Sequence, residues 1–222
     1  MTQTMAQIGR LIVFEGVEGA GKTTQLQLTA AYLRAHCPQP VLVTREPGGT
    51  ALGQRLRQLL LQGEAMSDRT ELLLFAADRA EHVATCLRPS LEQNTLVLCD
   101  RYTDSTLAYQ HYGRGLERSL IEQLNAIATE GLTSDLTFWF DLDVTTGLAR
   151  SQKRSGGDRI EQTELAFHQR VQAGFVALAA QDPQRIIRLD AGRSIEQIQA
   201  EIQTHLARYL ALDNQPPVEH CC

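Results

Sequence analysis

The residues best suited to chemistry lie near the start of the chain, in the run Gly16-Val-Glu-Gly-Ala-Gly-Lys-Thr-Thr24. This run fits the pattern G-x-x-x-x-G-K-[ST] of a phosphate-binding loop. Its glycines let backbone N–H groups curl around phosphate oxygens, where side chains would clash. Lys22 can reach the β- and γ-phosphates of a nucleoside triphosphate, and the Thr23 hydroxyl can bind Mg²⁺. The alternative is a glycine-rich turn between a strand and a helix that carries an incidental lysine.

Further charged residues stand where apolar runs end. Asp100 and Arg101 directly follow one such run, and the turn-rich segment Arg45-Glu-Pro-Gly-Gly-Thr50 follows another. In phosphate-loop proteins an acid at a strand exit typically holds Mg²⁺ beside the β- and γ-phosphates. Arg101 can point to an acceptor phosphate. The alternatives are that Asp100 simply ends a strand and that 45–50 is only a turn.

Two helical patterns carry side chains that suit a nucleotide. Phe75, Arg79 and His82 are spaced i, i+4, i+7 and share one helix face. A flat ring and a forked donor suit a nucleobase, although an aromatic residue at helical spacing is more often core. Ser105 and Tyr109 share a face in the helix that follows Arg101, where a capping turn and substrate contact are both open.

A basic group surrounds two glycines later in the chain. Its members are Arg150, Lys153, Arg154 and Arg159. A run of charge is usually a solvated face. In a phosphoryl-transfer enzyme, however, a flexible basic loop suggests a lid, which brings arginine to the transferring group and excludes water. We therefore predict a lid at about 150–160.

Apolar strand runs alternate with helical patterns along the chain, which predicts a parallel sheet covered by helices on both faces. Strands are expected at 11–15, 41–44, 96–99, 136–140 and 186–189. Helices are expected at 22–35, 51–61, 69–88 (stopped by Pro89), 104–112, 117–130 (ended by Gly131), 145–153, 161–180 and 194–211. The expected fold is an α/β phosphate-loop NTPase-like, three-layer fold with five parallel strands. In such sheets ligands bind beyond the carboxyl ends of the strands, so the charged loops should meet at one edge.

The composition indicates a globular protein with one domain. Of the 222 residues 43% are hydrophobic and 21% are charged, which is ordinary for such proteins. We expect a single domain over 1–212 and a disordered tail at 213–222. A formal net charge of −5 gives no general attraction to nucleic acid, so we expect no nucleic-acid partner.

The cysteines and the apolar runs bear on location. The five cysteines are scattered without metal-ligand spacing, which fits a reducing cytosol. No apolar run reaches the length of a membrane span, and the first ten residues do not resemble a signal peptide. We therefore expect a cytoplasmic protein that does not bind membranes. The terminal pair Cys221-Cys222 leaves lipidation as an alternative, although no basic cluster or apolar segment supports it.

Taken together, five segments resemble thymidylate kinase in order and spacing, over about residues 9–210. They are Phe14-Glu-Gly-Val-Glu-Gly-Ala-Gly-Lys-Thr-Thr24, Arg45-Glu-Pro-Gly-Gly-Thr50, Leu74-Phe-Ala-Ala-Asp-Arg79, Asp100-Arg-Tyr-Thr-Asp-Ser-Thr-Leu-Ala-Tyr-Gln110 and Asp158-Arg-Ile-Glu161. The resemblance implies an ATP-dependent dTMP kinase that produces dTDP, uses Mg²⁺ and forms a homodimer. The phosphate loop alone is generic, whereas its conjunction with the other four segments is specific.

The resemblance also implies roles for individual residues. ATP would be bound by Gly16, Val17, Glu18, Gly19, Ala20, Gly21, Lys22 and Thr23, and Mg²⁺ by Thr23 and Asp100. Residues implied to bind dTMP are Glu18, Arg45, Phe75, Arg79, Arg101, Ser105, Thr106, Tyr109 and Gln110. Within this set Phe75 would stack on thymine, Arg79 would hydrogen-bond the base, and Tyr109 would stand near the 2′ position of the sugar.

The resemblance implies that catalysis rests on Lys22, Arg101 and one further arginine. In the family this arginine comes either from the phosphate loop or from the lid. The loop position here is Gly19, so the lid should supply it. Arg154 is the first candidate, and Arg150 or Arg159 the next. Because the acceptor phosphate is already anionic, no strong general base is needed.

Two other functions are alternatives to a dTMP kinase. One is a kinase of the same architecture that acts on a different nucleotide, against which the segments around Phe75 and Asp100 argue. The other is a switch that hydrolyses GTP slowly. A guanine-binding switch would need an Asn-Lys-x-Asp signature, and Lys22 and Lys153 are the only lysines. Neither lysine stands in that signature.

Overall fold

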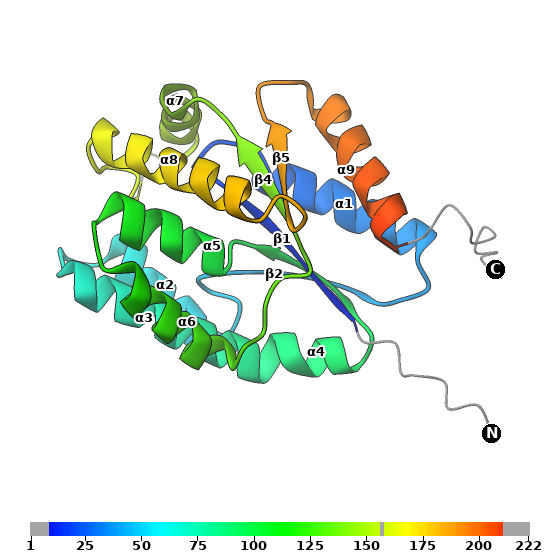
Figure 1. Ribbon diagram of the computed structural model, residues 1–222, viewed down its shortest axis with the longest axis horizontal. Helices are drawn as coiled ribbons and strands as arrows, with labels where there is room; N and C mark the ends of the chain where they lie inside the picture. The colour runs from blue at the N-terminus through cyan, green and yellow to red at the C-terminus, as the bar shows by residue number, and fades with distance from the viewer. Residues whose placement is uncertain (1–8, 156–157, 211–222) are drawn as a thin grey trace.

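The computed structural model describes residues 9–155 and 158–210, without the side chains of Arg154 and Ser155. The predicted tail at 213–222 and part of the predicted lid lie outside the described residues. Five strands form one sheet in the order β2-β3-β1-β4-β5, and every neighbouring pair is parallel (Figure 1). They are β1 (Arg10–Gly16), β2 (Val41–Arg45), β3 (Leu96–Asp100), β4 (Leu136–Asp141) and β5 (Ile186–Asp190). The predicted α/β fold with five parallel strands is confirmed.

The central strand β1 shows why apolar runs predicted the sheet well. It lies between β3 and β4, and its side chains alternate between two core clusters. Ile12 and Phe14 belong to one cluster, whereas Leu11 and Val13 belong to the other. Since a strand covered on both faces has no polar side, its sequence reads as a continuous apolar run.

The helices cover both faces of the sheet. They are α1 (Lys22–His36), α2 (Ala51–Gln62), α3 (Asp68–His82), α4 (Arg88–Glu92), α5 (Thr103–Thr106), α6 (Arg118–Thr129), α7 (Val144–Ser155), α8 (Leu165–Gln181) and α9 (Ile195–Leu210), with π-helical turns η1 (Val83–Leu87) and η2 (Leu107–Gly113). In Figure 1, α1 and α9 lie together on one side of the strands, and α3 and α6 lie on the other. No helix among the described residues is long and apolar enough to cross a membrane.

The prediction that Pro89 stops the third long helix was wrong. The chain runs from α3 through η1 into α4 and ends at Glu92. At the π-helical turn the N–H of Arg88 bonds to the carbonyl of Val83, five residues earlier. Pro89 therefore falls in the first turn of a new helical segment, where the N–H that proline lacks is not needed.

The helix predicted at 161–180 begins later, at Leu165. A turn precedes it, because the Asp158 carboxylate accepts hydrogen bonds from the N–H groups of Ile160 and Glu161, both at 2.9 Å. Helix α6 ends at Thr129, and Glu130 and Gly131 follow with φ of 49° and 78°. Gly131 was predicted to end this helix, and Glu130 shares that role because it too has a positive φ.

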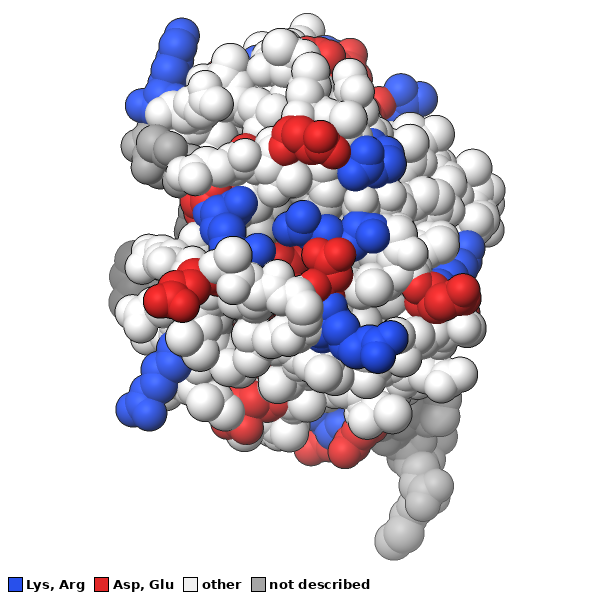
Figure 2. Space-filling model, turned by 90° about the vertical axis from the view of Figure 1, so that its left-hand side faces the viewer, with Lys and Arg blue, Asp and Glu red and all other residues white. Residues whose placement is uncertain are grey.

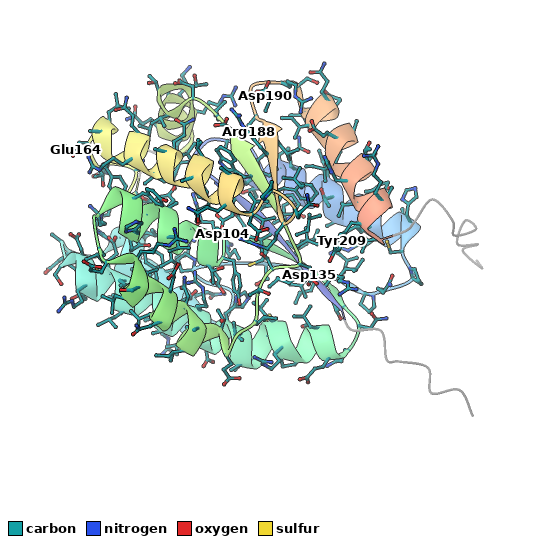
Figure 3. The ribbon with its side chains drawn as sticks, viewed as in Figure 1. Asp104, Asp135, Glu164, Arg188, Asp190 and Tyr209 are labelled. Carbon is teal, nitrogen blue, oxygen red and sulfur yellow. The ribbon has the colours of Figure 1, made fainter. Side chains whose placement is uncertain are left out.

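An ion pair joins the short helix α5 to the residue that precedes β5. Asp104, labelled in Figure 3, lies in the interior between α5 and the strands, and both its oxygens accept from Arg185, at 2.7 and 3.0 Å. Such a two-pronged contact fixes orientation as well as distance. Asp104 therefore positions the residues that follow it, Ser105 and Thr106, at the carboxyl edge of the sheet.

Candidate active site

A cleft of about 400 Å³ opens at the carboxyl edge of the sheet. Figure 2 looks onto this face, where basic and acidic side chains gather around a hollow. The phosphate loop, the ends of β2 and β3, helices α2, α3 and α5, η2 and the turn before α8 contribute its walls. The lining residues are 18–24, 45–47, Arg57, Leu61, Phe75, Arg79, 100–102, Ser105, Thr106, Tyr109, Asp158, Ile160 and Glu161.

The phosphate loop connects β1 to the first turn of α1. Lys22, which is 8% exposed, donates hydrogen bonds from Nζ to the carbonyls of Gly16 and Val17, both at 2.9 Å. Burial and the charge of Arg101 lower the pKa of Lys22 to about 8, against the opposing effect of nearby carboxylates. The lysine is thus held at the loop, where an anion in the cleft would raise its pKa and favour its charged form.

Gly19 cannot carry a side chain in this backbone. Its φ is +71°, and a Cβ there would lie 2.1 Å from the carbonyl oxygen of Gly147 in α7. A side chain on the facing Gly147 is equally blocked, because its Cβ would lie 2.4 Å from the carbonyl oxygen of Glu18. An arginine at position 19 therefore does not fit, which supports the expectation that the lid supplies it.

The two residues predicted to hold Mg²⁺ lie together. Thr23 Oγ1 donates to Asp100 Oδ2 at 3.3 Å, and Asp100 Oδ1 is buried without a hydrogen-bond partner in the described structure. Mg²⁺ prefers oxygen ligands and is usually held by one or two carboxylates together with substrate phosphates. The described residues contain no group of three or more His, Cys, Asp or Glu that could hold a metal. The oxygens present fit a metal that also needs phosphate ligands.

Arg101 lines the cleft directly after strand β3. Its φ is +73°, and its guanidinium donates to Glu18 Oε1 at 2.6 Å and to Ser105 Oγ at 3.1 Å. The Tyr109 hydroxyl donates to both Glu18 oxygens at 2.8 Å, and the guanidinium lies 5.0 Å from the Tyr109 ring centre. Burial raises the pKa of Glu18, but the charges of Arg101 and Lys22 outweigh burial and hold it below its ordinary value.

Glu15 supports this wall from behind and was not predicted as a site residue. It is fully buried and accepts hydrogen bonds from the N–H of Tyr102 at 2.8 Å, the N–H of Ser105 at 3.1 Å and the Ser105 hydroxyl at 2.5 Å. Burial raises its pKa to about 7, although the charge of Arg101 opposes the rise. Glu15 thus fixes the turn that holds Arg101.

The pair predicted to meet a base comes together on α3. Phe75 is half-buried and lines the cleft, as does Arg79. Arg79 is 2% exposed, and most of its N–H groups are engaged. It donates to Glu46 Oε2, Thr106 Oγ1, Asn125 Oδ1 and the carbonyl of Tyr102, at 2.8, 2.7, 2.6 and 3.0 Å. The guanidinium is therefore rigidly placed beside Phe75.

Gln110 lies apart from the other predicted dTMP residues. It is 2% exposed, does not line the cleft, and donates to Glu71 Oε1 at 3.2 Å. Gly16 and Val17 likewise do not line the cleft, and their carbonyls accept from Lys22. The structure thus brings together most of the predicted residues and places these three behind the surface.

The three candidate arginines of the lid differ in position. Arg150 is exposed on α7, and Arg154 lies near the end of the same helix with a side chain outside the described structure. Arg159 does not line the cleft, because it donates to the carbonyl of Leu60 at 2.9 Å and forms an ion pair with the carboxylate of Glu71. Arg159 therefore ties the end of the predicted lid to α2 and α3.

Several residues that line the cleft were not predicted from the sequence. Arg57 lines the cleft and donates to the carbonyl of Pro47 at 2.9 Å. A single arginine on an amphipathic helix gives no signal of such a role. Asp158 and Glu161 also line the cleft. They belong to a segment quoted for the family resemblance, so a signal was present without a role attached to it.

The chain is similar to known proteins in both sequence and structure. A family model described as thymidylate kinase matches residues 14–202. The thymidylate kinase of Cyanothece sp. is 57% identical over 222 residues, covering 91% of this chain and 95% of the relative. That of Trichormus variabilis is 56% identical over 206 residues, covering 91% and 97%. The crystal structure of thymidylate kinase from Ehrlichia chaffeensis matches with a TM-score of 0.74 and 36% identity, covering 89% of this chain and 98% of that one.

Proposed function

The chain belongs to the thymidylate kinase family, its activity is the ATP-dependent phosphorylation of dTMP to dTDP, and we propose that the cleft described above is the site of this reaction. The proposal rests on one observation: the phosphate loop lines the same cleft as Phe75 and Arg79, the two side chains that suit a nucleobase. Lys22 and Thr23 stand on one wall, Phe75 and Arg79 on another, and Arg101 lies on the wall formed by the β3 exit.

The loop side of the cleft suits the ATP phosphates. Residues 18–23 would surround them with backbone N–H groups at the N-terminus of α1, and Lys22 would bind the β- and γ-phosphates. Gly16 and Val17 would act from behind, because their carbonyls hold Lys22. Thr23 and Asp100 would hold Mg²⁺, and the bound ion would neutralise phosphate charge. The buried, unpartnered oxygen of Asp100 supports this assignment.

The opposite side suits dTMP. Phe75 would stack on thymine and Arg79 would donate to the base, while Arg101 and Arg45 would hold the phosphate. The other residues predicted to bind dTMP would support these contacts. Tyr109 and Glu18 would stand at the sugar, Ser105 and Thr106 would orient Arg101 and Arg79, and Gln110 would act from behind through Glu71.

The mechanism needs positioning and charge neutralisation more than proton transfer. The acceptor is a phosphate oxygen that is already anionic, so in-line transfer requires two anions to approach each other. Lys22, Arg101 and the lid arginine, for which Arg154 is the first candidate, would neutralise the charge of the approaching groups. A closed lid would also exclude water, which otherwise hydrolyses ATP.

A homodimer and a cytoplasmic location complete the proposal. Exposed apolar side chains lie on α2, α3 and α6, among which α3 packs against both of the others. They are Leu52, Leu59, Leu73 and Ile127. Such a set suits burial against a second copy. The free thiols of Cys37, Cys86 and Cys99 fit a reducing compartment.

A coupled assay tests the proposal. ADP release from ATP is measured with each nucleoside monophosphate in turn, and the expected result is release that depends on dTMP. Preference for another monophosphate would contradict the assignment of Phe75 and Arg79. Hydrolysis independent of any acceptor would instead favour a nucleotide switch.

A further inference from the structure

We propose that His82 is a positioning residue for dTMP recognition, which fixes the guanidinium of Arg79 through the shared carboxylate of Glu46. His82 lies at the end of α3, is fully buried and does not line the cleft. The inference rests on the proposed contact between Arg79 and the base.

A continuous chain of polar contacts leads from His82 to the cleft. Its Nδ1 lies 2.9 Å from Glu46 Oε1, and the other Glu46 oxygen accepts from Arg79 Nε at 2.8 Å. Glu46 itself is 4% exposed. A buried carboxylate that receives a charged donor on each oxygen has little freedom to rotate. Removal of the His82 donor would therefore leave one oxygen of Glu46 unpaired and free Glu46 to turn.

The other side of the imidazole is also fixed. A hydrogen bond of 2.7 Å joins Nε2 to Thr44 Oγ1 on β2, and a Cβ on Gly49 would lie 2.5 Å from Nε2. The ring is thus clamped between Thr44 on the strand and the loop that follows Arg45. His82 joins this phosphate-side loop to the base-side Arg79.

The charges around the imidazole favour its doubly protonated form. Burial lowers the pKa of His82, but its neighbours Cys86 and Glu46 outweigh burial and raise it to about 9. The other charged groups that face the cluster are Arg79 and Asp78, and burial raises the pKa of Asp78 to about 6. An imidazolium can donate to Glu46 and to Thr44 at the same time.

Two polar variants separate the contact to Glu46 from the contact to Thr44. The Asn amide nitrogen of His82→Asn takes the place of Nδ1 and keeps the contact to Glu46. The Gln amide nitrogen of His82→Gln takes the place of Nε2 and keeps only the contact to Thr44. We expect His82→Gln to raise the KM for dTMP about tenfold, since a lost hydrogen bond to a charged group costs this much or more. His82→Asn should stay close to wild type, and the KM for ATP should not change in either variant.

A matched control is His168→Leu. His168 in α8 is also fully buried, and neither ring nitrogen has a hydrogen-bond partner in the described structure. This variant should leave the KM for dTMP unchanged. Melting temperatures of all variants show which of them are folded. Equal effects on dTMP and ATP, or equal effects of Asn and Gln, would overturn the positioning role.

The double variant separates this inference from the proposed function. Arg79→Ala alone should raise the KM for dTMP, and adding His82→Gln should raise it no further, because contacting groups are not additive. If Arg79→Ala leaves this KM unchanged, the proposed base contact is wrong. If Arg79→Ala raises it but His82→Gln does not, or if the two effects add in full, the inference about His82 is wrong.

Discussion

The buried carboxyl group of Glu15 should make the stability of the protein fall as pH rises from about 4.5 to about 7. Its pKa rises from the ordinary 4.5 to about 7 on burial. Each pH unit of such a difference is worth about 1.4 kcal/mol, so ionised Glu15 costs the folded state about 3 kcal/mol. Between these two values the unfolded chain releases the proton before the folded chain does. The free energy of unfolding therefore decreases with rising pH in this window.

The variant Glu15→Gln removes the titration and keeps the shape. The amide oxygen still accepts from the N–H groups of Tyr102 and Ser105, and the amide nitrogen can donate to the Ser105 hydroxyl. The difference in unfolding free energy, variant minus wild type, should rise by about 3 kcal/mol from about pH 4.5 to about pH 8. Urea unfolding at a series of pH values measures this difference. Any constant cost of the amide cancels, because only the change with pH is compared.

Glu71→Gln provides the control. Burial raises the pKa of Glu71, but hydrogen bonds from Arg159 and Arg114 outweigh burial and hold it below its ordinary value. Stability from Glu71 is therefore lost only as pH falls below 4.5. The control difference should stay flat where the Glu15 difference rises. A flat line for Glu15→Gln would refute the reasoning, and so would a difference that falls with pH.

Three further predictions concern activity and assembly. Lys22→Ala should lose kcat on the order of a hundredfold or more with an unchanged melting temperature, and near-normal turnover in the coupled assay would remove Lys22 from the mechanism. Arg154→Ala should slow transfer on the order of 10³-fold with little change in dTMP affinity measured by calorimetry. If affinity alone suffers, the catalytic arginine lies elsewhere. Ile127 is 74% exposed on α6, and Ile127→Lys should convert the dimer to a monomer as measured by sedimentation. A dimer that persists would place the interface on another face.

The sequence predicted the parts of the site that are local. The phosphate loop is a contiguous pattern, and Asp100 and Arg101 follow directly from an apolar strand run. The meeting of these residues at one edge follows from the direction of parallel strands. Gln110 departs from this pattern, because its helical spacing says nothing about the buried Glu71 that it contacts.

What the sequence could not predict depends on contacts between distant segments. The partners of Glu15 and Glu46 lie many residues away, at Ser105 and His82, and no periodicity encodes such pairs. The helix passes Pro89 for a similar reason. Whether a proline ends a helix depends on the hydrogen bonds of the preceding turn, and the residue types at 83–87 do not reveal the π-helical register of η1.

The close approach of Gly19 to Gly147 has an evolutionary consequence. The phosphate loop and α7 touch backbone to backbone, with no room for a side chain on either glycine. A single substitution at position 19 therefore cannot bring an arginine into the loop of this chain. The helix that leads to the lid would first have to move, so an ancestor could pass from one placement of the arginine to the other only through a change in backbone path.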